Sequence, residues 1–277
     1  ATAILKEALA PLGSTYEHDL FQGLESGWVD RCENQGKRSG AYSWGVYGVH
    51  PFVLMSWNDT YESMSTLAHA MGHSMHSWYS SQEQDFVNSE YTIFCAEVAS
   101  TTNENLLLEY MLQHAKGRER LYYLNLYLEQ IRTTVFRQML FAEFELLTHA
   151  AVEKGEALTA DKLESIWMKL NRTYYGEDVV LDTELAAEWS RIPHFYRPFY
   201  VYQYATGYAA AMTLSHNLRT KGEPAQKAYL HYLASGGSDY SITLLQRAGV
   251  DMTTPEPFQI TFQKFTDCLN ELETLTE

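Results

Sequence analysis

Two histidines four residues apart are the strongest candidate for chemistry in this chain of 277 residues. His69 and His73 lie within residues 59–80, where the spacing of apolar side chains predicts a helix. Residues four apart on a helix lie on one face, so both imidazoles can bind one metal ion. The alternative is that the pair has a structural role or arises by chance, because the chain has ten histidines.

Two acidic residues on the next predicted helix, residues 89–113, could complete a metal site. Glu97 follows His73 by 24 residues (97 − 73), so an antiparallel second helix would bring its carboxylate beside the imidazoles. Two His and one Glu leave the fourth position of a zinc ion open for water, as in catalytic zinc sites. Glu104 lies two turns further on and could hydrogen-bond to a ligand histidine. The alternative for both glutamates is a solvated helix face.

The residue after the first histidine does not fit the catalytic pattern. In H-E-x-x-H motifs this residue is the glutamate that acts as general base, but here it is Ala70. A methyl group can neither accept a proton nor orient a water molecule. The site therefore predicts metal binding without the usual proton transfer.

The remaining pattern predicts a mainly α fold of many helices with one small β-sheet. Glycines punctuate aromatic and β-branched runs in residues 36–57, which favours a sheet of two or three strands. Helices are expected over 3–12, from Ser14 to about Trp28, 118–153 and 198–219, and caps at Thr159 and Asp182 start two more. No repeat or linker is visible, so residues 1–277 are expected to form a single domain.

Composition and charge disfavour some classes of partner and location. Thirty-five acidic and 20 basic residues give a formal charge of −15, which disfavours nucleic acid and anionic membranes as partners. No signal peptide and no bilayer-spanning apolar run are visible. The three cysteines, Cys32, Cys95 and Cys268, have no metal-type spacing. Cys95 is expected to be buried, and a reducing cytoplasm fits best.

Four stretches in the right order resemble the oligoendopeptidase F branch of the thimet-oligopeptidase-like zinc peptidases. They are GKRSGAY at 36–42, HAMGHSMHS at 69–77, FCAEVASTTNE at 94–104 and IPHFYRPFYVYQYATG at 192–207. The resemblance covers essentially the whole chain and implies that it is the C-terminal catalytic half of such a peptidase, with an N-terminal half of the same protein as a partner. It implies a multi-helix, zincin-like catalytic domain with the small β-sheet at the edge of the cleft. It also implies one Zn²⁺ per chain, held by His69, His73 and Glu97, with Glu104 beside the ligands.

The resemblance further implies residues that contact a peptide substrate. His194 matches a histidine that binds the substrate carbonyl, and Tyr200 and Tyr204 are the best matches to tyrosines that bind the oxyanion. Tyr208 continues the i, i+4, i+8 spacing, although related branches have a tyrosine near Gly207. The alternative for this segment is an aromatic core helix.

A strand at the cleft edge can pair with an extended peptide backbone whatever its side chains. Gly40 and Tyr42, in the first of the matching stretches, are the predicted substrate contacts in this region. The alternative is a small hairpin with a purely structural role.

Two hypotheses about function follow. In the first, the chain is a zinc metallo-oligopeptidase for short peptides, inactivated by a deliberate Glu→Ala exchange at position 70. In the second, it is a natural homologue that binds peptides or zinc without turnover. Retention of the ligands and tyrosines favours the first, because a lineage without catalysis would be expected to lose them.

Overall fold

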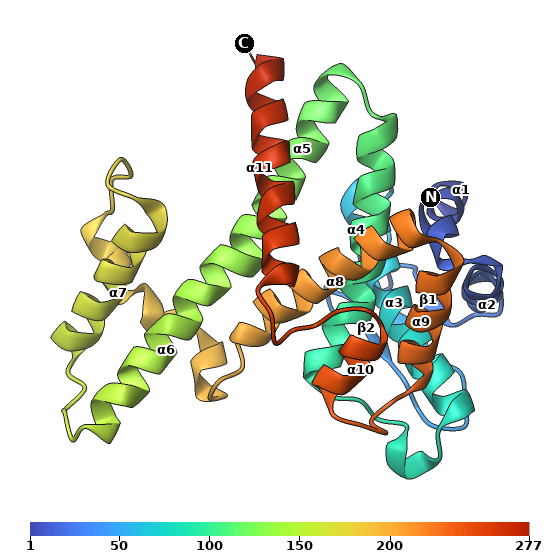
Figure 1. Ribbon diagram of the computed structural model, residues 1–277, viewed down its shortest axis with the longest axis horizontal. Helices are drawn as coiled ribbons and strands as arrows, with labels where there is room; N and C mark the ends of the chain where they lie inside the picture. The colour runs from blue at the N-terminus through green and yellow to red at the C-terminus, as the bar shows by residue number, and fades with distance from the viewer. Residues whose placement is uncertain (277) are drawn as a thin grey trace. The chain divides into compact units, whose positions relative to one another are not determined.

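The computed structural model describes residues 1–276 and divides the chain into two compact units. Unit 1 contains Ala1–Leu128 and the chain from Gly207 onward, and unit 2 contains Glu129–Thr206. Both units are built mainly from helices (Figure 1). The predicted mainly α fold with a small sheet is confirmed.

Unit 1 contains the two helices that carry the candidate metal ligands. Its helices are α1 (Thr2–Leu9), α2 (Ser14–Glu25), α3 (Tyr61–Glu83), α4 (Ile93–His114), most of α5 (Gly117–Ile131), most of α8 (Tyr202–Lys221), α9 (Glu223–Ala234), α10 (Ser241–Arg247) and α11 (Glu256–Thr276). Short 3₁₀ turns add η1 (Ala10–Leu12) and η2 (Phe86–Asn88). The apolar faces of α3 and α4 contribute to a shared core that includes Met71, Met75, Cys95 and Val98.

Helix α3 begins at Tyr61, two residues after the start of the predicted range 59–80. Thr60 is its N-cap, and the Thr60 hydroxyl accepts a hydrogen bond from the Ser63 N–H at 3.2 Å. Asp59 precedes the cap with a φ of 56°. A capping side chain satisfies one of the first N–H groups, which have no partner within the helix. The cap therefore fixes the start of α3. Helices α3 and α4 correspond to the predicted helices 59–80 and 89–113.

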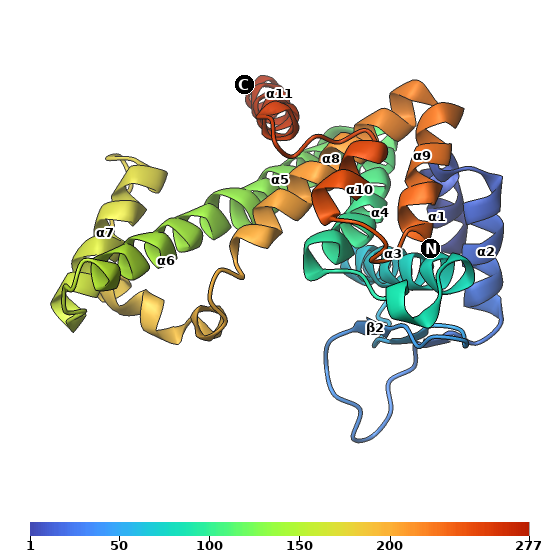
Figure 2. The same ribbon diagram turned by 60° about the horizontal axis from the view of Figure 1, so that its bottom comes forward.

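A small sheet lies against α3 in unit 1 (Figure 2). Its strands are β1 (Val29–Asp30), β2 (Tyr42–Trp44) and β3 (Phe52–Leu54), in the order β1-β3-β2. β1 is parallel to β3, and β2 is antiparallel to it, with Ser43 opposite Val53. Two of these strands lie within the predicted range 36–57, and β1 lies outside it.

The predicted extent of the second helix, to Trp28, is wrong. Helix α2 ends at Glu25, and Gly27 follows with a φ of 88°, a conformation that glycine adopts without steric cost. The chain then turns so that Trp28 packs against Gly23, where an added Cβ would lie 2.6 Å from the indole ring. This reversal places Val29 in the sheet.

Unit 2 is organised around α6 (Arg137–Glu153) and α7 (Ala160–Tyr175). Leu140, Phe141 and Phe144 of α6 pack against Trp167 and Leu170 of α7. Thr159 caps α7 as predicted, because its hydroxyl accepts a hydrogen bond from the Lys162 N–H. The shorter elements are the π-helical turn η3 (Arg132–Phe136) and the 3₁₀ segments η4 (Thr183–Arg191) and η5 (Pro193–Tyr196).

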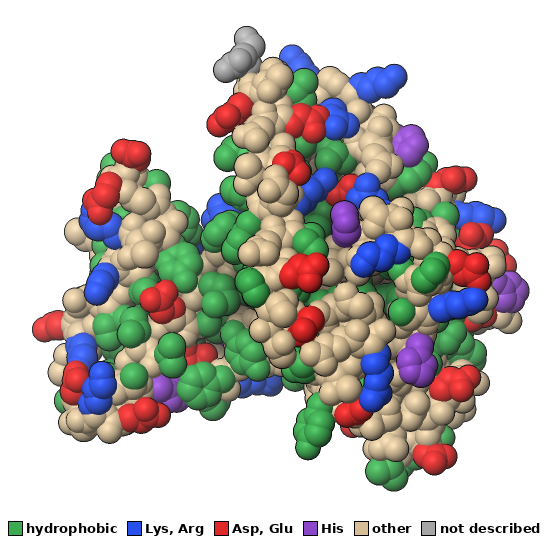
Figure 3. Space-filling model, in the orientation of Figure 1, with side chains coloured by type: hydrophobic (Ala, Val, Ile, Leu, Met, Phe, Trp, Pro, Cys, Tyr) green, Lys and Arg blue, Asp and Glu red, His purple; other side chains and the backbone are tan. Residues whose placement is uncertain are grey.

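Charged side chains show no segregation by sign on the face of the molecule in Figure 3, where basic residues are interspersed with acidic ones. Within residues 1–276, no helix combines the length and apolar character needed to cross a bilayer. Cys32 is exposed, whereas Cys95 and Cys268 are buried, and all three are free thiols. The expectation that Cys95 is buried is confirmed.

Candidate metal centre

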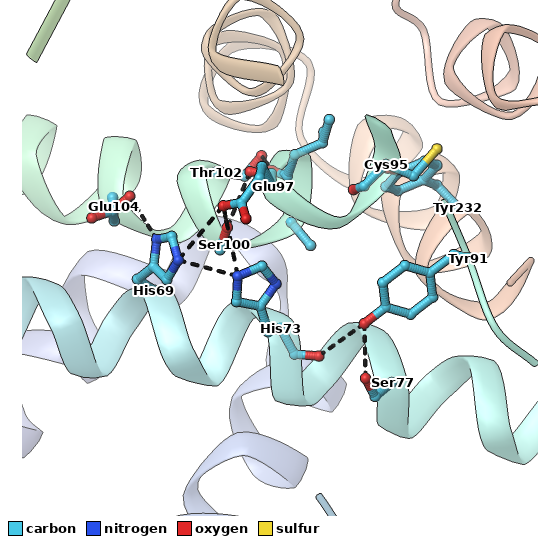
Figure 4. A network of polar contacts seen from close by, with 12 residues as sticks. His69, His73, Ser77, Tyr91, Cys95, Glu97, Ser100, Thr102, Glu104 and Tyr232 are labelled. Carbon is cyan, nitrogen blue, oxygen red and sulfur yellow. Dashed lines mark hydrogen bonds and ion pairs between the residues drawn. The ribbon is translucent and has the colours of Figure 1, made fainter. Parts of the chain in front are cut away.

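The two histidines of α3 face each other across one helical turn, as shown in Figure 4. Their ring centroids are 4.7 Å apart, and the Nε2 atoms of His69 and His73 are separated by 3.1 Å. This follows from the four-residue spacing on a helix. Both lone-pair nitrogens therefore point to one small region.

Glu97 of α4 supplies a carboxylate to the same region (Figure 4). Its Oε2 lies 3.6 Å from Nε2 of His69 and 3.7 Å from Nε2 of His73. Three ligand atoms held about 2.1 Å from one zinc ion at tetrahedral angles would lie about 3.4 Å apart. The observed separations are close to that value, so these residues fit a zinc ion with an open fourth position.

Glu104 orients one of the two imidazoles. Its Oε2 lies 3.0 Å from Nδ1 of His69, and its Oε1 accepts a hydrogen bond from the Ser65 hydroxyl at 3.3 Å. A carboxylate at Nδ1 favours the tautomer with its proton on Nδ1, which leaves Nε2 free to bind metal. The structure thus places Glu104 beside His69, one of the predicted ligands.

The two histidines differ in their electrostatic surroundings. Burial opposes protonation of His69, but the carboxylates of Glu104 and Glu97 outweigh it and raise the pKa of His69. Burial and the neighbouring His69 lower the pKa of His73 to about 3. A neutral His73 is the form that binds a metal ion.

Two glycines lie beside the site, neither recognised from the sequence as part of it, and one of them, Gly72, allows α3 and α4 to approach closely. A Cβ on Gly72 would lie 2.6 Å from the Cα of Ser100 and 2.8 Å from the carbonyl oxygen of Ala99, both on α4. A Cβ on Gly207 of α8 would lie 3.5 Å from the Cβ of Glu97. Sequence offers one signal for Gly72, its place between the histidines, but the approach of α4 depends on tertiary packing.

Tyr91 also supports α3 and was not singled out in the sequence. Its hydroxyl lies 2.7 Å from the Ser77 hydroxyl and donates to the backbone carbonyl of His73 at 3.4 Å (Figure 4). The Tyr91 ring stacks on His76 with centroids 3.5 Å apart. These contacts fix the turn of α3 that follows the second histidine.

Ala70 is buried on α3, with 2% of its surface exposed. Ser74 lies one turn later on the same side of the helix. Its hydroxyl oxygen is 2.9 Å from the hydroxyl oxygen of Ser43 on β2. Position 70 therefore lies on the side of α3 that faces the small sheet.

The predicted substrate contacts of unit 1 lie in different surroundings. Tyr42 is 56% exposed on β2, which is an edge strand of the sheet, and Gly40 is exposed with a φ of 100°. Tyr208 is instead buried, and its hydroxyl has no hydrogen-bond partner among residues 1–276. Burial raises the pKa of Tyr208 well above its usual value. A substrate-binding role for these three residues stays a prediction.

Unit 2 brings His194, Tyr200 and Tyr204 together. The His194 ring is stacked on Tyr200 with centroids 5.9 Å apart, and its Nε2 lies 3.3 Å from the Tyr204 hydroxyl. The predicted helix start at Pro198 is wrong, because α8 begins at Tyr202. Tyr200 therefore precedes the helix, but its ring still contacts Tyr204, with centroids 5.5 Å apart.

Comparisons with known proteins agree on one family. The family described as "Peptidase family M3" matches residues 10–264. Oligopeptidase PepF of Bacillus subtilis is 50% identical over 97% of this chain, and group B oligopeptidase PepB of Streptococcus agalactiae is 43% identical over 98%. The crystal structure of oligoendopeptidase-F from Enterococcus faecium superposes with a TM-score of 0.76 at 38% identity, covering 99% of this chain and 43% of that one. The chain spans 40% and 45% of the length of these two curated relatives.

Proposed function

This chain belongs to peptidase family M3, and on that premise we propose that it is the zinc-binding catalytic part of a metallo-oligopeptidase for short peptides. The observation that carries the proposal is the spacing of three ligand atoms from His69, His73 and Glu97. One zinc ion bound there would supply a Lewis acid for the peptide carbonyl and a water of lowered pKa.

Other residues of the chain orient the metal ligands and bind the substrate. Glu104 holds His69 in the metal-binding tautomer, and β2, with Gly40 and Tyr42, offers an edge for an extended peptide. His194 with Tyr200 or Tyr204 holds the substrate carbonyl and the oxyanion. A donor of this kind contributes about 3 kcal/mol.

Ala70 is expected to prevent peptide cleavage by this chain. General-base catalysis needs a group that accepts a proton from the water and passes it to the leaving amine, and a methyl group does neither. We therefore expect the chain to bind zinc and peptide but not to cut. The retained ligands and tyrosines support a deliberate Glu→Ala exchange in an active peptidase.

The same residue favours a second candidate function, a natural homologue that binds peptides or zinc without turnover. The two candidates differ in what a restored glutamate would do. In an inactivated enzyme it completes the site, whereas in a natural binding protein other parts of the substrate site need not be suited to catalysis.

We extend the proposal to the whole chain, with residues 1–277 acting as one catalytic domain. Helix α8 supports this, because it carries residues of both units without interruption. The negative charge of −15 supports peptide rather than nucleic acid as the partner. A cytoplasmic location stays a prediction. An N-terminal half of the same protein as a partner also stays a prediction, and the curated relatives are about twice as long as this chain.

The test is the variant Ala70→Glu, assayed with internally quenched fluorescent peptides. We expect the zinc-loaded variant to cleave them, a chelator to stop cleavage, and the parent chain to be inactive. The control is the same variant in a chain extended to the length of the relatives. If the folded, zinc-loaded variant is inactive in both forms, the peptidase proposal is wrong and the second candidate is favoured.

Metal content gives an independent check that needs no activity. Elemental analysis of the parent chain should find about one zinc per chain, and His73→Ala should abolish it because two protein ligands hold zinc poorly. A native chain that takes up no zinc would contradict the site assignment itself.

A further inference from the structure

Unit 2 contains a buried carboxylate that the proposed chemistry does not use. Glu145 lies on the inner face of α6, where only 4% of it is exposed. Burying a carboxylate is unfavourable unless hydrogen bonds compensate. Its Oε1 accepts a hydrogen bond from the backbone N–H of Phe199 at 2.7 Å.

The residue held by this hydrogen bond has an unfavourable backbone conformation. Phe199 has a φ of 56°, which is rare for a bulky residue, and it follows Pro198 in a turn that normally has glycine or asparagine at this place. Burial of the ring does not explain the conformation, because Phe199 is 47% exposed. The ring contacts His149 at a centroid distance of 4.7 Å. The hydrogen bond from the Phe199 N–H to the Glu145 carboxylate is therefore a contact that stabilises the turn through its backbone.

The turn stands directly before the aromatic cluster of unit 2. Tyr200 follows Phe199 and stacks on His194, and Tyr204 of α8 approaches the same imidazole. A change of φ at Phe199 would rotate the chain that carries Tyr200 relative to η5, which carries His194. The conformation of one residue thus sets the geometry of three candidate substrate contacts.

We propose that Glu145 is a positioning residue: its carboxylate holds the turn at Phe199 and so keeps Tyr200 and Tyr204 against His194. The inference rests on the proposed function, in which these three side chains bind the substrate carbonyl and oxyanion. Glu145 itself acts only through the backbone of Phe199.

Three substitutions separate this role from simple packing. Glu145→Ala removes the acceptor, and Glu145→Gln keeps a carbonyl oxygen in its place. Phe199→Gly removes the steric cost of the positive φ, because glycine adopts this conformation freely. If the carboxylate serves to hold the turn, Glu145→Ala should be harmful when Phe199 is present and nearly harmless when glycine replaces it.

The first readout is the geometry of the aromatic cluster. In protein with carbon-13-labelled histidine, the His194 ring should show ring-current shifts and NOEs from Tyr200. We expect these signals to be lost in Glu145→Ala, kept in Glu145→Gln, and restored in Glu145→Ala/Phe199→Gly. Circular dichroism of each variant controls for loss of fold.

The second readout is the affinity of the zinc-loaded chain for a fluorescein-labelled short peptide, measured at equilibrium because no cleavage is expected. Glu145→Ala should weaken binding about tenfold, the order expected from releasing one strained residue. Glu145→Gln and the double variant should stay within about twofold of the parent, a difference well below 1 kcal/mol.

Two results would overturn the proposal. One is a set of intact His194–Tyr200 contacts in Glu145→Ala. The other is a double variant as defective as Glu145→Ala, which would make the carboxylate an ordinary structural acceptor. A parent chain that binds no peptide would contradict the proposed function alone, because the NMR contacts decide the role of Glu145 without any peptide.

Discussion

Glu104 is the residue whose contribution to the metal centre is most directly measurable. Its carboxylate contacts Nδ1 of His69 at 3.0 Å and helps raise the pKa of that histidine. Glu104→Gln removes the negative charge while keeping the size of the side chain. We expect zinc affinity to fall about 10- to 100-fold, the usual cost of losing such a partner. Competition with a chromogenic zinc chelator measures the change.

The matched control for this prediction is Glu119→Gln, which removes the same charge from an exposed position on α5. Its zinc affinity should equal that of the parent chain. Equal affinities for the parent and Glu104→Gln would show that the orientation of His69 does not depend on this carboxylate.

At the scale of single residues, the sequence predicts what helical periodicity dictates. The spacing of His69 and His73 requires both rings to share one face, and the same argument connects Glu97 with Glu104 on the next helix. Gly72 and Tyr91 could not be assigned in this way. Their contacts, with Ser100 and with the His73 carbonyl, depend on how two elements pack, which no local pattern records.

At the scale of elements, the metal centre depends on the close approach of α3 and α4 at Gly72. Gly72→Ala would place a methyl group 2.6 Å from the Ser100 Cα, so the helices must separate. Overpacking of this kind costs about 1–3 kcal/mol of stability. Because separation also moves Glu97 from the histidines, we expect weaker zinc binding together with a lower unfolding midpoint. Denaturant titration and zinc competition measure the two effects.

Gly207→Ala is the matched control, because it also adds a methyl group beside the α4 site. Here the new Cβ would meet the Glu97 Cβ at 3.5 Å, which is an ordinary contact. Alanine favours the helix over glycine by about 1 kcal/mol, so stability should be equal or higher and zinc affinity unchanged. If both variants weaken zinc binding equally, close helix packing is not the cause.

Element boundaries were predicted less well than element types, for physical reasons. The aromatic spacing around Tyr200 continues the period of α8, but the turn at Phe199 delays the helix until Tyr202. Strand β1 has two residues, which is too short for any periodicity, and it exists because β3 lies beside it. Long periodic segments such as α3 and α4 were predicted because each turn repeats the same signal.

At the scale of the whole molecule, the three free thiols should differ in reactivity. Cys32 is exposed, while Cys95 and Cys268 are buried, and burial raises the pKa of Cys268 to about 11. The thiolate is the reactive form, so a raised pKa slows alkylation. At pH 8 we expect iodoacetamide to modify Cys32 rapidly and the other two only on unfolding. Mass spectrometry of peptide fragments after timed labelling checks this, and fast modification of Cys268 in the native state would contradict the burial.

The division into two units predicts where a metal ion stabilises the chain. His69, His73 and Glu97 all belong to unit 1, and they join α3 to α4. A ligand that binds the folded state at 100 times its dissociation constant adds about 2.7 kcal/mol of stability.

Hydrogen exchange with and without zinc should therefore show slower exchange of amides in α3 and α4. Amides of α6 and α7 in unit 2 should exchange at unchanged rates, because none of the three ligand residues lies there. His73→Ala is the control and should abolish the effect of zinc in unit 1. Equal protection of both units would mean that they open as one cooperative body, so that metal binding to α3 and α4 would stabilise the aromatic cluster of His194 as well.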